Sequence, residues 1–373
     1  MQQYLNPNCN LMSIKISPID KSRISTVDFD KLDFGRTFSD HMFEMIWQDG
    51  QWQRPKIIPY GPISFTPALQ SLHYGQSVFE GMKAYYADEE TIHLFRPEDH
   101  HQRLNNSSKR ICVPETDYNT FINGIEELLR LDADWVPRKR GQALYIRPIA
   151  FASEEYLAAK ASDNYHFYII TSPVAAYYKE GFNPVSLTTA DGYVRAVKGG
   201  TGEAKTAGNY AASFLPARQA VEKGYTQVLW LDAIEKKYVE EVGTMNIFFL
   251  IDGTLVTPEL SGSVLNGITR RSVIELAKDQ GIPLEERRIT IDEVFEAGKS
   301  GKLEEVFGSG TAAVISPVRL IHHNGKKLEI GDGSVGPLAK KMFDTITGIQ
   351  YGEIEDTFGW IHPVKVKDEA RVE

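Results

Sequence analysis

A lysine that follows a glycine-rich turn is the residue of this sequence best placed to do chemistry. Residues Gly199–Tyr210 read Gly-Gly-Thr-Gly-Glu-Ala-Lys-Thr-Ala-Gly-Asn-Tyr and lead into a pattern typical of an amphipathic helix. Glycine lets the backbone approach a bound group closely, and the start of a helix favours an anion such as phosphate. Lys205 could therefore bind phosphate as a cation, or lose its proton and attack a carbonyl carbon.

Residues 199–206 also resemble the phosphate-binding loop of enzymes that transfer phosphoryl groups, but one residue does not match. A P-loop has the pattern Gly-x-x-x-x-Gly-Lys-Ser/Thr, and residues 199–206 match it except that Ala204 replaces the glycine before the lysine. Leu229–Asp232 would supply an apolar strand ending in a magnesium-binding acid. Because the loop must bring backbone N–H groups onto phosphate oxygens, the alanine leaves an NTPase only as a remote alternative.

Metal and serine chemistry find little support in the sequence. The pairs His100-His101 and His322-His323 lack the i, i+4 spacing of two zinc ligands on a helix. We interpret them as solvated or loop histidines and predict no metal site. A Gly-x-Ser-x-Gly nucleophile turn is absent. Gly308–Thr311 is instead a turn of small residues whose backbone N–H groups suit an anion.

The second hypothesis for Lys205 is a Schiff base with pyridoxal 5'-phosphate, and several segments support it. Such a site needs a lysine, an acid beside the pyridine nitrogen, a hydroxyl near the phenolate oxygen and a phosphate cup. Glu241 and Tyr210 are candidates for the acid and the hydroxyl. Arg103 and the helix start at Asn266–Arg270 are candidates for the cup.

The elements that must position these residues predict an α/β chain in two lobes. At 373 residues the chain exceeds the usual size of one core. Predicted strands cover Gln142–Phe151, Asn164–Thr171, Gln227–Asp232 and Asn246–Ile251, the last turning at Asp252-Gly253 into Thr254–Thr257. Predicted helices cover the apolar face from Phe121 to Leu129, then Asn209–Lys223, Thr269–Gln280, a segment capped by Thr290, and Pro337–Thr347. We expect a small N-terminal domain at 1–172, a linker at 173–182 and a larger domain at 183–373.

The composition of the chain argues against several classes of function. The formal net charge is −9 and no block of Lys and Arg occurs, which argues against nucleic-acid binding. No apolar run approaches the ~20 residues needed to span a bilayer, and two cysteines cannot build a disulfide framework. The N-terminal residues show no secretory pattern. We expect a cytoplasmic protein with small-molecule substrates and no nucleic-acid or membrane partner.

Taken together, these motifs resemble the branched-chain amino acid aminotransferases, which belong to the fold-type IV group of pyridoxal-phosphate enzymes. The resemblance runs from Phe34–Met42 to Phe358–Trp360, and its most specific pieces are Leu72–Gly75, Phe79–Tyr85, the Lys205 segment, Glu241–Asn246 and Phe307–Thr311. It implies a two-domain fold, with a small α/β domain and a larger mixed-sheet domain. It also implies a homodimer in which the small domain of one subunit contributes to the pocket of the other.

The resemblance also implies a role for each matching residue. Lys205 would carry the cofactor, Glu241 would pair with the pyridine nitrogen, and Tyr210 would face the phenolate oxygen. The phosphate would be held by Arg103, Ile268, Thr269 and Thr311. The substrate pocket would be lined by Phe34, Tyr74, Phe79, Tyr145, Arg147, Tyr177, Thr244 and Ala312.

The residues themselves leave rival interpretations open. Tyr145 and Phe79 could be core aromatics, and Arg147 in mid-strand could belong to a structural ion pair. Arg96 and Arg270 could be helix-surface residues, so both stay outside the predicted site. The stretch Ala313–Ser316 has no cysteine where mammalian relatives carry a Cys-x-x-Cys switch, so we expect no thiol regulation of that kind.

The reaction implied is reversible, ping-pong transfer of an amino group between leucine, isoleucine or valine and 2-oxoglutarate. Lys205 would remove the substrate α-proton as a neutral amine. A D-amino-acid transaminase or an aminodeoxychorismate lyase remains an alternative within the same fold. A binding module without turnover is a further alternative, against which the set Lys205, Glu241, Tyr210 and Arg103 argues.

Overall fold

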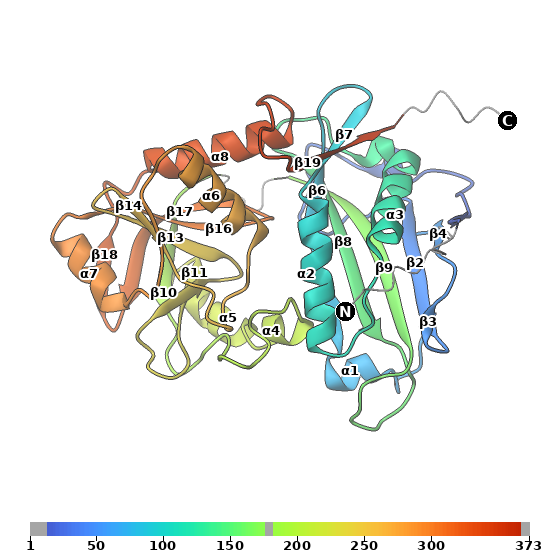
Figure 1. Cartoon of the computed structure of the whole chain (residues 1–373), viewed down its shortest axis with the longest axis horizontal. Helices are drawn as coiled ribbons and strands as arrows, with labels where there is room; N and C mark the ends of the chain where they lie inside the picture. The colour runs from blue at the N-terminus through green and yellow to red at the C-terminus, as the bar shows by residue number, and fades with distance from the viewer. Residues whose placement is uncertain (1–12, 176–181, 367–373) are drawn as a thin grey trace, which may run out of the picture.

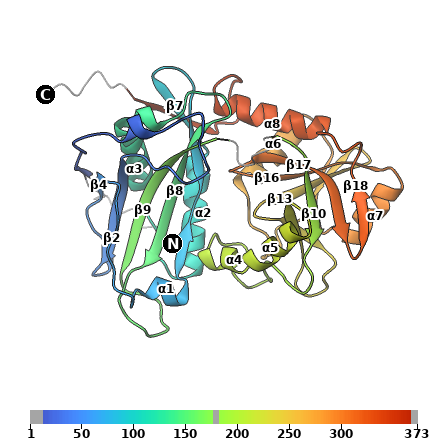
Figure 2. The same cartoon turned by 180° about the vertical axis from the view of Figure 1, so that it is seen from behind.

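Two β-sheet lobes lie side by side and are joined near one end. The computed structural model describes residues 13–175 and 182–366. Figures 1 and 2 show the lobe built from the N-terminal half beside the lobe built from the C-terminal half, with helix α8 running along one edge toward the junction. The predicted mixed α/β class with two lobes is confirmed.

The first lobe is a mainly antiparallel sheet. Its strand order is β1 (Lys15–Ile16), β4 (Lys56–Pro59), β2 (His41–Gln48), β9 (Tyr165–Val174), β8 (Ala143–Ala152), β6 (Met82–Tyr86), β7 (Thr91–Phe95) and β19 (Ile361–Lys365). Strand β3 (Gln51–Trp52) pairs with β2, and β5 (Ser77–Phe79) pairs with β8.

Helices α2 (Pro97–Arg110) and α3 (Tyr118–Leu131) cover one face of this sheet (Figure 1). The predicted apolar face of α3 is confirmed, because Phe121, Ile125 and Leu129 are buried in the core of the lobe. Shorter helical segments are η1 (Ile24–Thr26), α1 (Gln70–Tyr74) and η2 (Ala133–Trp135).

The second lobe is a mixed sheet. Its strand order is β12 (Val239–Val242), β11 (Gln227–Leu231), β10 (Val185–Thr189), β17 (Val314–His323), β16 (Leu303–Gly310), β13 (Asn246–Ile251), β14 (Thr254–Thr257) and β15 (Leu284–Glu286), with β18 (Lys326–Glu329) paired to β17. Its helices are α4 (Ala207–Ala211), α5 (Phe214–Glu222), α6 (Ile268–Asp279), α7 (Ile291–Lys299) and α8 (Pro337–Gln350).

The predicted continuous helix over 209–223 is wrong. The structure has two short helices, α4 and α5, separated at Ala212 and Ser213. Pro216 stands in the first turn of α5. A proline has no N–H to donate, and its ring clashes with the carbonyl four residues earlier, here that of Ala212. By contrast, the Thr290 cap of α7 is confirmed, since its side chain accepts a hydrogen bond from the Glu293 N–H.

The described residues leave the first sheet at the end of β9 and return to it at β19. Strand β9 ends at Val174, so Pro173 and Val174 belong to the first sheet and not to the expected linker; residues 176–181 lie outside the described ranges. The chain end returns as β19, which pairs antiparallel with β7. The first lobe therefore includes residues from both ends of the described chain. No helix within 13–175 and 182–366 has both the length and the apolar character for crossing a bilayer.

Candidate active site

A cleft between the lobes gathers most of the predicted site residues. Both lobes line it: β5, β8 and α2 from the first, and the start of α4, the start of α6 and the β16–β17 turn from the second. Thirteen of the fifteen predicted residues are on its wall: Phe34, Phe79, Arg103, Tyr145, Arg147, Lys205, Tyr210, Glu241, Thr244, Ile268, Thr269, Thr311 and Ala312.

Two predicted residues are not on this wall. Tyr74, on α1, is 45% exposed, and its hydroxyl donates a hydrogen bond to the Leu157 carbonyl. Tyr177 lies outside the described residues. The described part of this chain therefore does not bring Tyr74 to the cleft.

Backbone hydrogen bonds hold Lys205 at the cleft, and its side-chain amine contacts Tyr210. Its N–H donates to the Ser107 hydroxyl of α2 at 2.9 Å, and its carbonyl accepts from the Phe79 N–H at 3.1 Å. Its Nζ lies 2.6 Å from the Tyr210 hydroxyl. Both backbone contacts come from the first lobe, so the lysine of one lobe is positioned by the other.

Glu241 is a buried carboxylate at the base of the same cleft. It lies on β12, where its Oε1 accepts hydrogen bonds from the Leu265 N–H at 2.8 Å and from Asn246 Nδ2 at 3.2 Å. Its Oε2 forms an ion pair with Arg195 at 2.8 Å. Burial raises the pKa of Glu241, and Arg195 opposes the rise. A cation brought into the cleft would stabilise the ionised form further.

Backbone and hydroxyl donors form an anion cradle beside these groups. Helix α6 begins at Ile268 after Gly267, and the first residues of a helix have free N–H groups. Ser309, which is 1% exposed, has a hydroxyl with no partner among the described residues. Because Gly267, Ile268, Thr269, Ser309 and Thr311 all line this cleft, an anion bound beside the start of α6 could accept a hydrogen bond from the buried hydroxyl.

Arg103 reaches the cleft through a buried ionic cluster. Its Nε and one Nη donate to the two oxygens of Glu80 at 2.6 and 3.0 Å, and its other Nη donates to the Asn266 carbonyl at 3.2 Å. His100 Nδ1 contacts Glu80 at 2.8 Å. Burial alone would raise the pKa of Glu80, but Arg103 and His100 hold that pKa well below its usual range.

The interpretation of His100 and His101 as solvated or loop residues is wrong. Both lie in α2 and are buried; His101 contacts the Thr116 carbonyl at 2.9 Å. The second pair, His322 and His323, lies half-buried in strand β17 and not in a loop. A pair of adjacent histidines carries no pattern that predicts which polar partners from distant segments will accompany it into the core.

Aromatic rings and one arginine form the remaining wall. Phe34 and Tyr145 meet edge to face, with ring centroids 4.9 Å apart, and Phe79 lies 4.9 Å from Tyr210. The Arg147 guanidinium lies 4.6 Å from the centre of the Phe79 ring and donates to the Tyr145 hydroxyl at 3.0 Å. Its Nε has no hydrogen-bond partner among the described residues.

The sequence prediction missed several partners of these residues. The predicted site omits Glu80, Arg195, Asn246 and the Ser309 hydroxyl, although Glu80, Asn246 and Ser309 lie inside the motifs Phe79–Tyr85, Glu241–Asn246 and Phe307–Thr311. The available signal for Glu80 was an acid directly after Phe79, between residues typical of buried strands. Arg195 offered none, because only the folded loop brings it to Glu241.

Asp232, the acid that the NTPase hypothesis would assign to magnesium, has a structural role. The Asp232 carboxylate accepts hydrogen bonds from the N–H groups of Ile234, Glu235, Lys237 and Tyr238. These four bonds hold a turn, which explains an acid at the end of an apolar strand without a metal.

Comparison with known proteins agrees with this geometry. Residues 77–321 match the family model of class IV amino-transferases. The chain is 53% identical over 345 residues to branched-chain-amino-acid aminotransferase 2 of Bacillus subtilis, covering 92% of this chain and 95% of that protein. It is 46% identical to the branched-chain-amino-acid aminotransferase of Mycolicibacterium smegmatis, covering 88% and 91%.

Solved structures show the same fold. The Escherichia coli branched-chain amino acid aminotransferase superposes with a TM-score of 0.70 at 29% identity, covering 87% of this chain and 99% of that chain. A T.th. branched-chain amino acid aminotransferase, complexed with N-(5'-phosphopyridoxyl)-L-glutamate, superposes with a TM-score of 0.69 at 29% identity, covering 85% and 97%. The chain belongs to the class IV aminotransferases, among the branched-chain-amino-acid aminotransferases, whose cofactor is pyridoxal 5'-phosphate.

Proposed function

We propose that this chain transfers the amino group of L-leucine, L-isoleucine or L-valine to 2-oxoglutarate and catalyses the reverse reaction. The observation that carries the proposal is the placement of Lys205 Nζ 2.6 Å from Tyr210 in a cleft shared with Glu241 and an anion cradle. An amine, a buried acid and a cradle in one cleft are what a pyridoxal-phosphate enzyme needs.

The residues present fit the cofactor. The unpartnered Ser309 hydroxyl and the start of α6 suit a phosphate, and we assign the phosphate to Arg103, Ile268, Thr269 and Thr311. Glu241 would pair with the pyridine nitrogen, and Tyr210 would donate to the phenolate oxygen. When bound, the group withdraws electrons from the substrate α-carbon, which makes its proton acidic.

The chain supplies the base and its surroundings. Lys205 acts when its Nζ is neutral, since only then can it accept the substrate α-proton, hold it and return it. Tyr210 keeps that amine at a fixed place through the hydrogen bond at 2.6 Å. Arg195 favours the ionised form of Glu241 and opposes the effect of burial, which raises the pKa of this carboxyl.

One pocket must take both a branched side chain and a second carboxylate. The rings of Phe34, Phe79 and Tyr145 provide an apolar wall, and Arg147 with the Tyr145 hydroxyl provides donors beside it. We expect Arg147→Gln to lower kcat/KM for 2-oxoglutarate by about 10- to 100-fold, the effect of losing a charged hydrogen bond, and to affect leucine less. Steady-state kinetics with each substrate measure this, and equal losses would make Arg147 structural.

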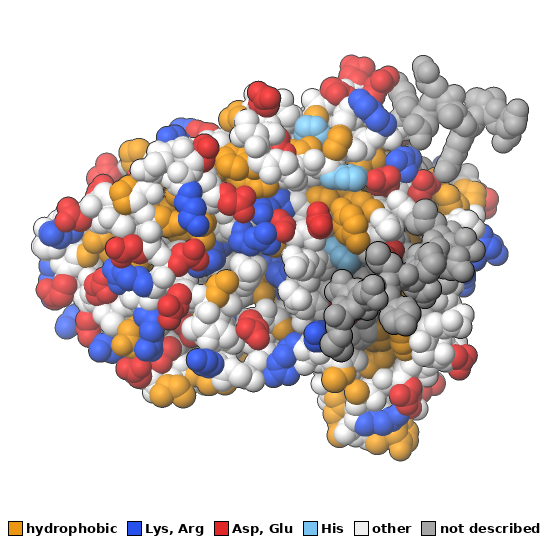
Figure 3. All heavy atoms as spheres, viewed as in Figure 1, with side chains coloured by type: hydrophobic (Ala, Val, Ile, Leu, Met, Phe, Trp, Pro, Cys, Tyr) orange, Lys and Arg blue, Asp and Glu red, His pale blue; other side chains and the backbone are white. Residues whose placement is uncertain are grey.

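We propose a homodimer on separate grounds. Apolar side chains gather at the end of the first lobe around α1 (Figure 3), where Leu72 is 71% and Leu157 is 62% exposed, beside Tyr74. A second subunit would cover this surface and would take Tyr74 into its own cleft. Light scattering after size exclusion should give twice the mass of 41.9 kDa; a monomer with full activity would refute this proposal.

An assay with purified protein tests the function directly. Protein loaded with pyridoxal phosphate should form glutamate from L-leucine and 2-oxoglutarate. Lys205→Ala should abolish turnover, while Lys198→Ala, at an exposed lysine outside the cleft, should retain it. Turnover of D-leucine in place of L-leucine would favour a D-amino-acid transaminase, and turnover by Lys205→Ala would refute the role of Lys205.

A further inference from the structure

The segment that brings Phe34 to the cleft has little structure of its own. Residues 23–40, which we name the Phe34 loop, contain only the three-residue turn η1 and no strand. The loop leaves the first lobe at Arg23 and rejoins it where β2 begins at His41. Its path must therefore be fixed by side chains and not by a hydrogen-bonded ladder.

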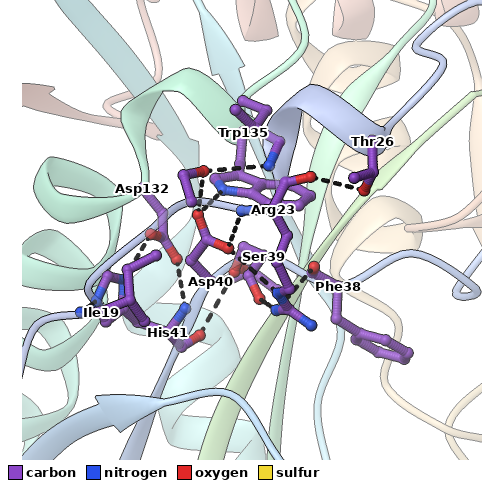
Figure 4. Close-up of polar contacts among 12 residues, drawn as sticks. Ile19, Arg23, Thr26, Phe38, Ser39, Asp40, His41, Asp132 and Trp135 are labelled. Atoms are coloured by element: carbon purple, nitrogen blue, oxygen red, sulfur yellow. Dashed lines mark hydrogen bonds and ion pairs between the residues drawn. The ribbon is translucent and has the colours of Figure 1, made fainter.

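Both ends of the Phe34 loop meet at Asp40, as Figure 4 shows. This carboxylate is 3% exposed. One oxygen accepts from the Arg23 N–H at 3.0 Å and from its Nε at 3.3 Å. The other accepts from the Ser22 hydroxyl at 2.5 Å and from Trp135 Nε1 at 2.8 Å. Asp40 thus ties the first residue of the loop to its last residue and both to η2.

The exit of the loop is fixed by a second buried carboxylate. Asp132 accepts from the His41 N–H at 2.9 Å and contacts His41 Nδ1 at 2.7 Å (Figure 4). His41 Nε2 accepts from the Ile19 N–H at 3.2 Å. The Ser39 N–H donates to the Thr171 carbonyl at 3.0 Å. These contacts attach the start of β2, and Ser39 just before it, to the first lobe.

Between its ends the loop has fewer polar ties. Gln142 Nε2 donates to the Phe29 carbonyl at 2.6 Å, and Asp30 pairs with Lys139 at the surface at 3.0 Å. Lys31 and Arg36, on either side of Phe34, have side chains that are 83% and 80% exposed. The Phe34 ring itself rests against Tyr145.

We propose that Asp40 is a positioning residue for substrate selection, which closes the Phe34 loop at its base and so holds the Phe34 ring against Tyr145 in the substrate pocket. Asp40 does not line the cleft, so it acts through Phe34 and not on the substrate. The proposal rests on the proposed function in one respect, namely that Phe34 contacts the branched side chain.

Replacing Asp40 with asparagine changes the charge and the hydrogen bonding of the side chain but not its size. Asp40→Asn keeps the shape but replaces one acceptor oxygen with an NH₂ group. Either orientation of the amide then sets a donor against donors, from Arg23 on one side or from Ser22 and Trp135 on the other. A donor left unpaired in a buried site is costly, so the base of the loop should open.

Trypsin digestion of the pyridoxal-phosphate-loaded protein measures the opening of the Phe34 loop independently of any activity assay. Asp40→Asn should increase the rate of cleavage after Lys31 and Arg36 about fivefold or more, because cleavage follows the population of the open loop. Asp30→Asn, which removes only the surface ion pair with Lys139, is the matched control and should change the rate by less than about twofold.

Steady-state kinetics test whether Asp40 affects substrate selection through the Phe34 ring. Asp40→Asn should lower kcat/KM for leucine about fivefold through KM and leave kcat/KM for alanine unchanged, since alanine has no branched side chain to contact the ring. In a Phe34→Ala background, Asp40→Asn should change leucine kcat/KM by less than about twofold, because the contact is already lost. Ser22→Ala, a milder variant that keeps the carboxylate, should shift trypsin cleavage and leucine KM in the same direction.

The outcomes are distinguishable. Unchanged cleavage in both Asp40→Asn and Ser22→Ala would overturn the proposal, as would equal losses for leucine and alanine or additive effects with Phe34→Ala. If the unsubstituted protein had no aminotransferase activity, the proposed function would fail, while the digestion would still decide whether Asp40 closes the loop.

Discussion

Glu80 is a buried acid whose contacts fix the position of Arg103. It is fully buried and engages two donors of Arg103, leaving the arginine oriented toward the start of α6. Glu80→Gln should weaken pyridoxal phosphate binding about tenfold, since the guanidinium loses its charged partner and its fixed direction. Fluorescence titration of the apoprotein measures the dissociation constant. Glu98→Gln, at an exposed position of the same helix, is the control; equal constants for both variants would contradict the role.

Lys83 is a buried cation outside the cleft. It donates to the Ala312 carbonyl at 2.7 Å, and burial lowers its pKa to about 8. Between pH 8 and its ordinary value of 10.5, the unfolded chain binds the proton and the folded chain does not. The free energy of unfolding should therefore rise with pH across this window.

Lys83→Met should remove that rise, while Lys340→Met, an exposed lysine of α8, should not. Urea unfolding of the apoprotein at several pH values between 8 and 10 measures the slope for each variant. If Lys83→Met kept the slope of the unsubstituted protein, the buried amine would not be its source.

At the scale of elements, the connection between β5 and β6 passes close to β8, where Gly81 faces the Tyr145 ring. A Cβ built at Gly81 would lie 1.9 Å from the Tyr145 hydroxyl, whereas one at Gly61 would meet nothing within 4 Å. Gly81→Ala should displace the Tyr145 ring and raise the KM for leucine about tenfold, and Gly61→Ala should leave it unchanged. A normal KM for Gly81→Ala would mean that the ring can move without loss.

The sequence predicted the elements whose patterns are local. The strands Asn246–Ile251 and Thr254–Thr257 have the predicted bounds, since a turn residue pair separates two apolar runs. The break between α4 and α5 was missed because the apolar periodicity continues through Pro216. The pairing of β19 with β7 joins segments from opposite ends of the chain, and no local pattern encodes such a partner.

The site follows the same rule. Residues within recognisable motifs, such as Lys205 and Glu241, could be assigned from the sequence, and they line one cleft. Their partners could not. The ion pair of Arg195 with Glu241 and the unpartnered Ser309 hydroxyl exist only after distant segments have packed together.

At the scale of the whole molecule, the lobes are joined through Arg96. The expectation that Arg96 and Arg270 lie on helix surfaces is wrong, since both are buried. Arg96, just before α2, donates to Glu275 of α6 at 2.9 and 3.1 Å and to Ser272 at 3.0 Å. Arg270 donates to the Pro258 carbonyl and to Glu286. A local pattern cannot show that distant segments will cover an arginine, whether they belong to the other lobe, as for Arg96, or to the same lobe, as for Arg270.

Arg96→Met should destabilise the protein by about 1–2 kcal/mol, because Ser272 and the partly exposed Glu275 lose the buried guanidinium that joins them to the first lobe. Chemical denaturation followed by tryptophan fluorescence measures the change in the free energy of unfolding. If the contact is the main link between the lobes, the variant should unfold in two separate transitions, one for each lobe. Arg218→Met, at a side chain that is 75% exposed, is the control. Equal stability of the two variants would show that the lobes hold together without this contact.

Covalent mapping of the cofactor tests the central assignment most directly. The protein loaded with pyridoxal phosphate is reduced with borohydride, digested and analysed by mass spectrometry. The account predicts one phosphopyridoxyl group, on the peptide that contains Lys205, and none in Lys205→Ala. Attachment to another lysine, or to no residue at all, would contradict it.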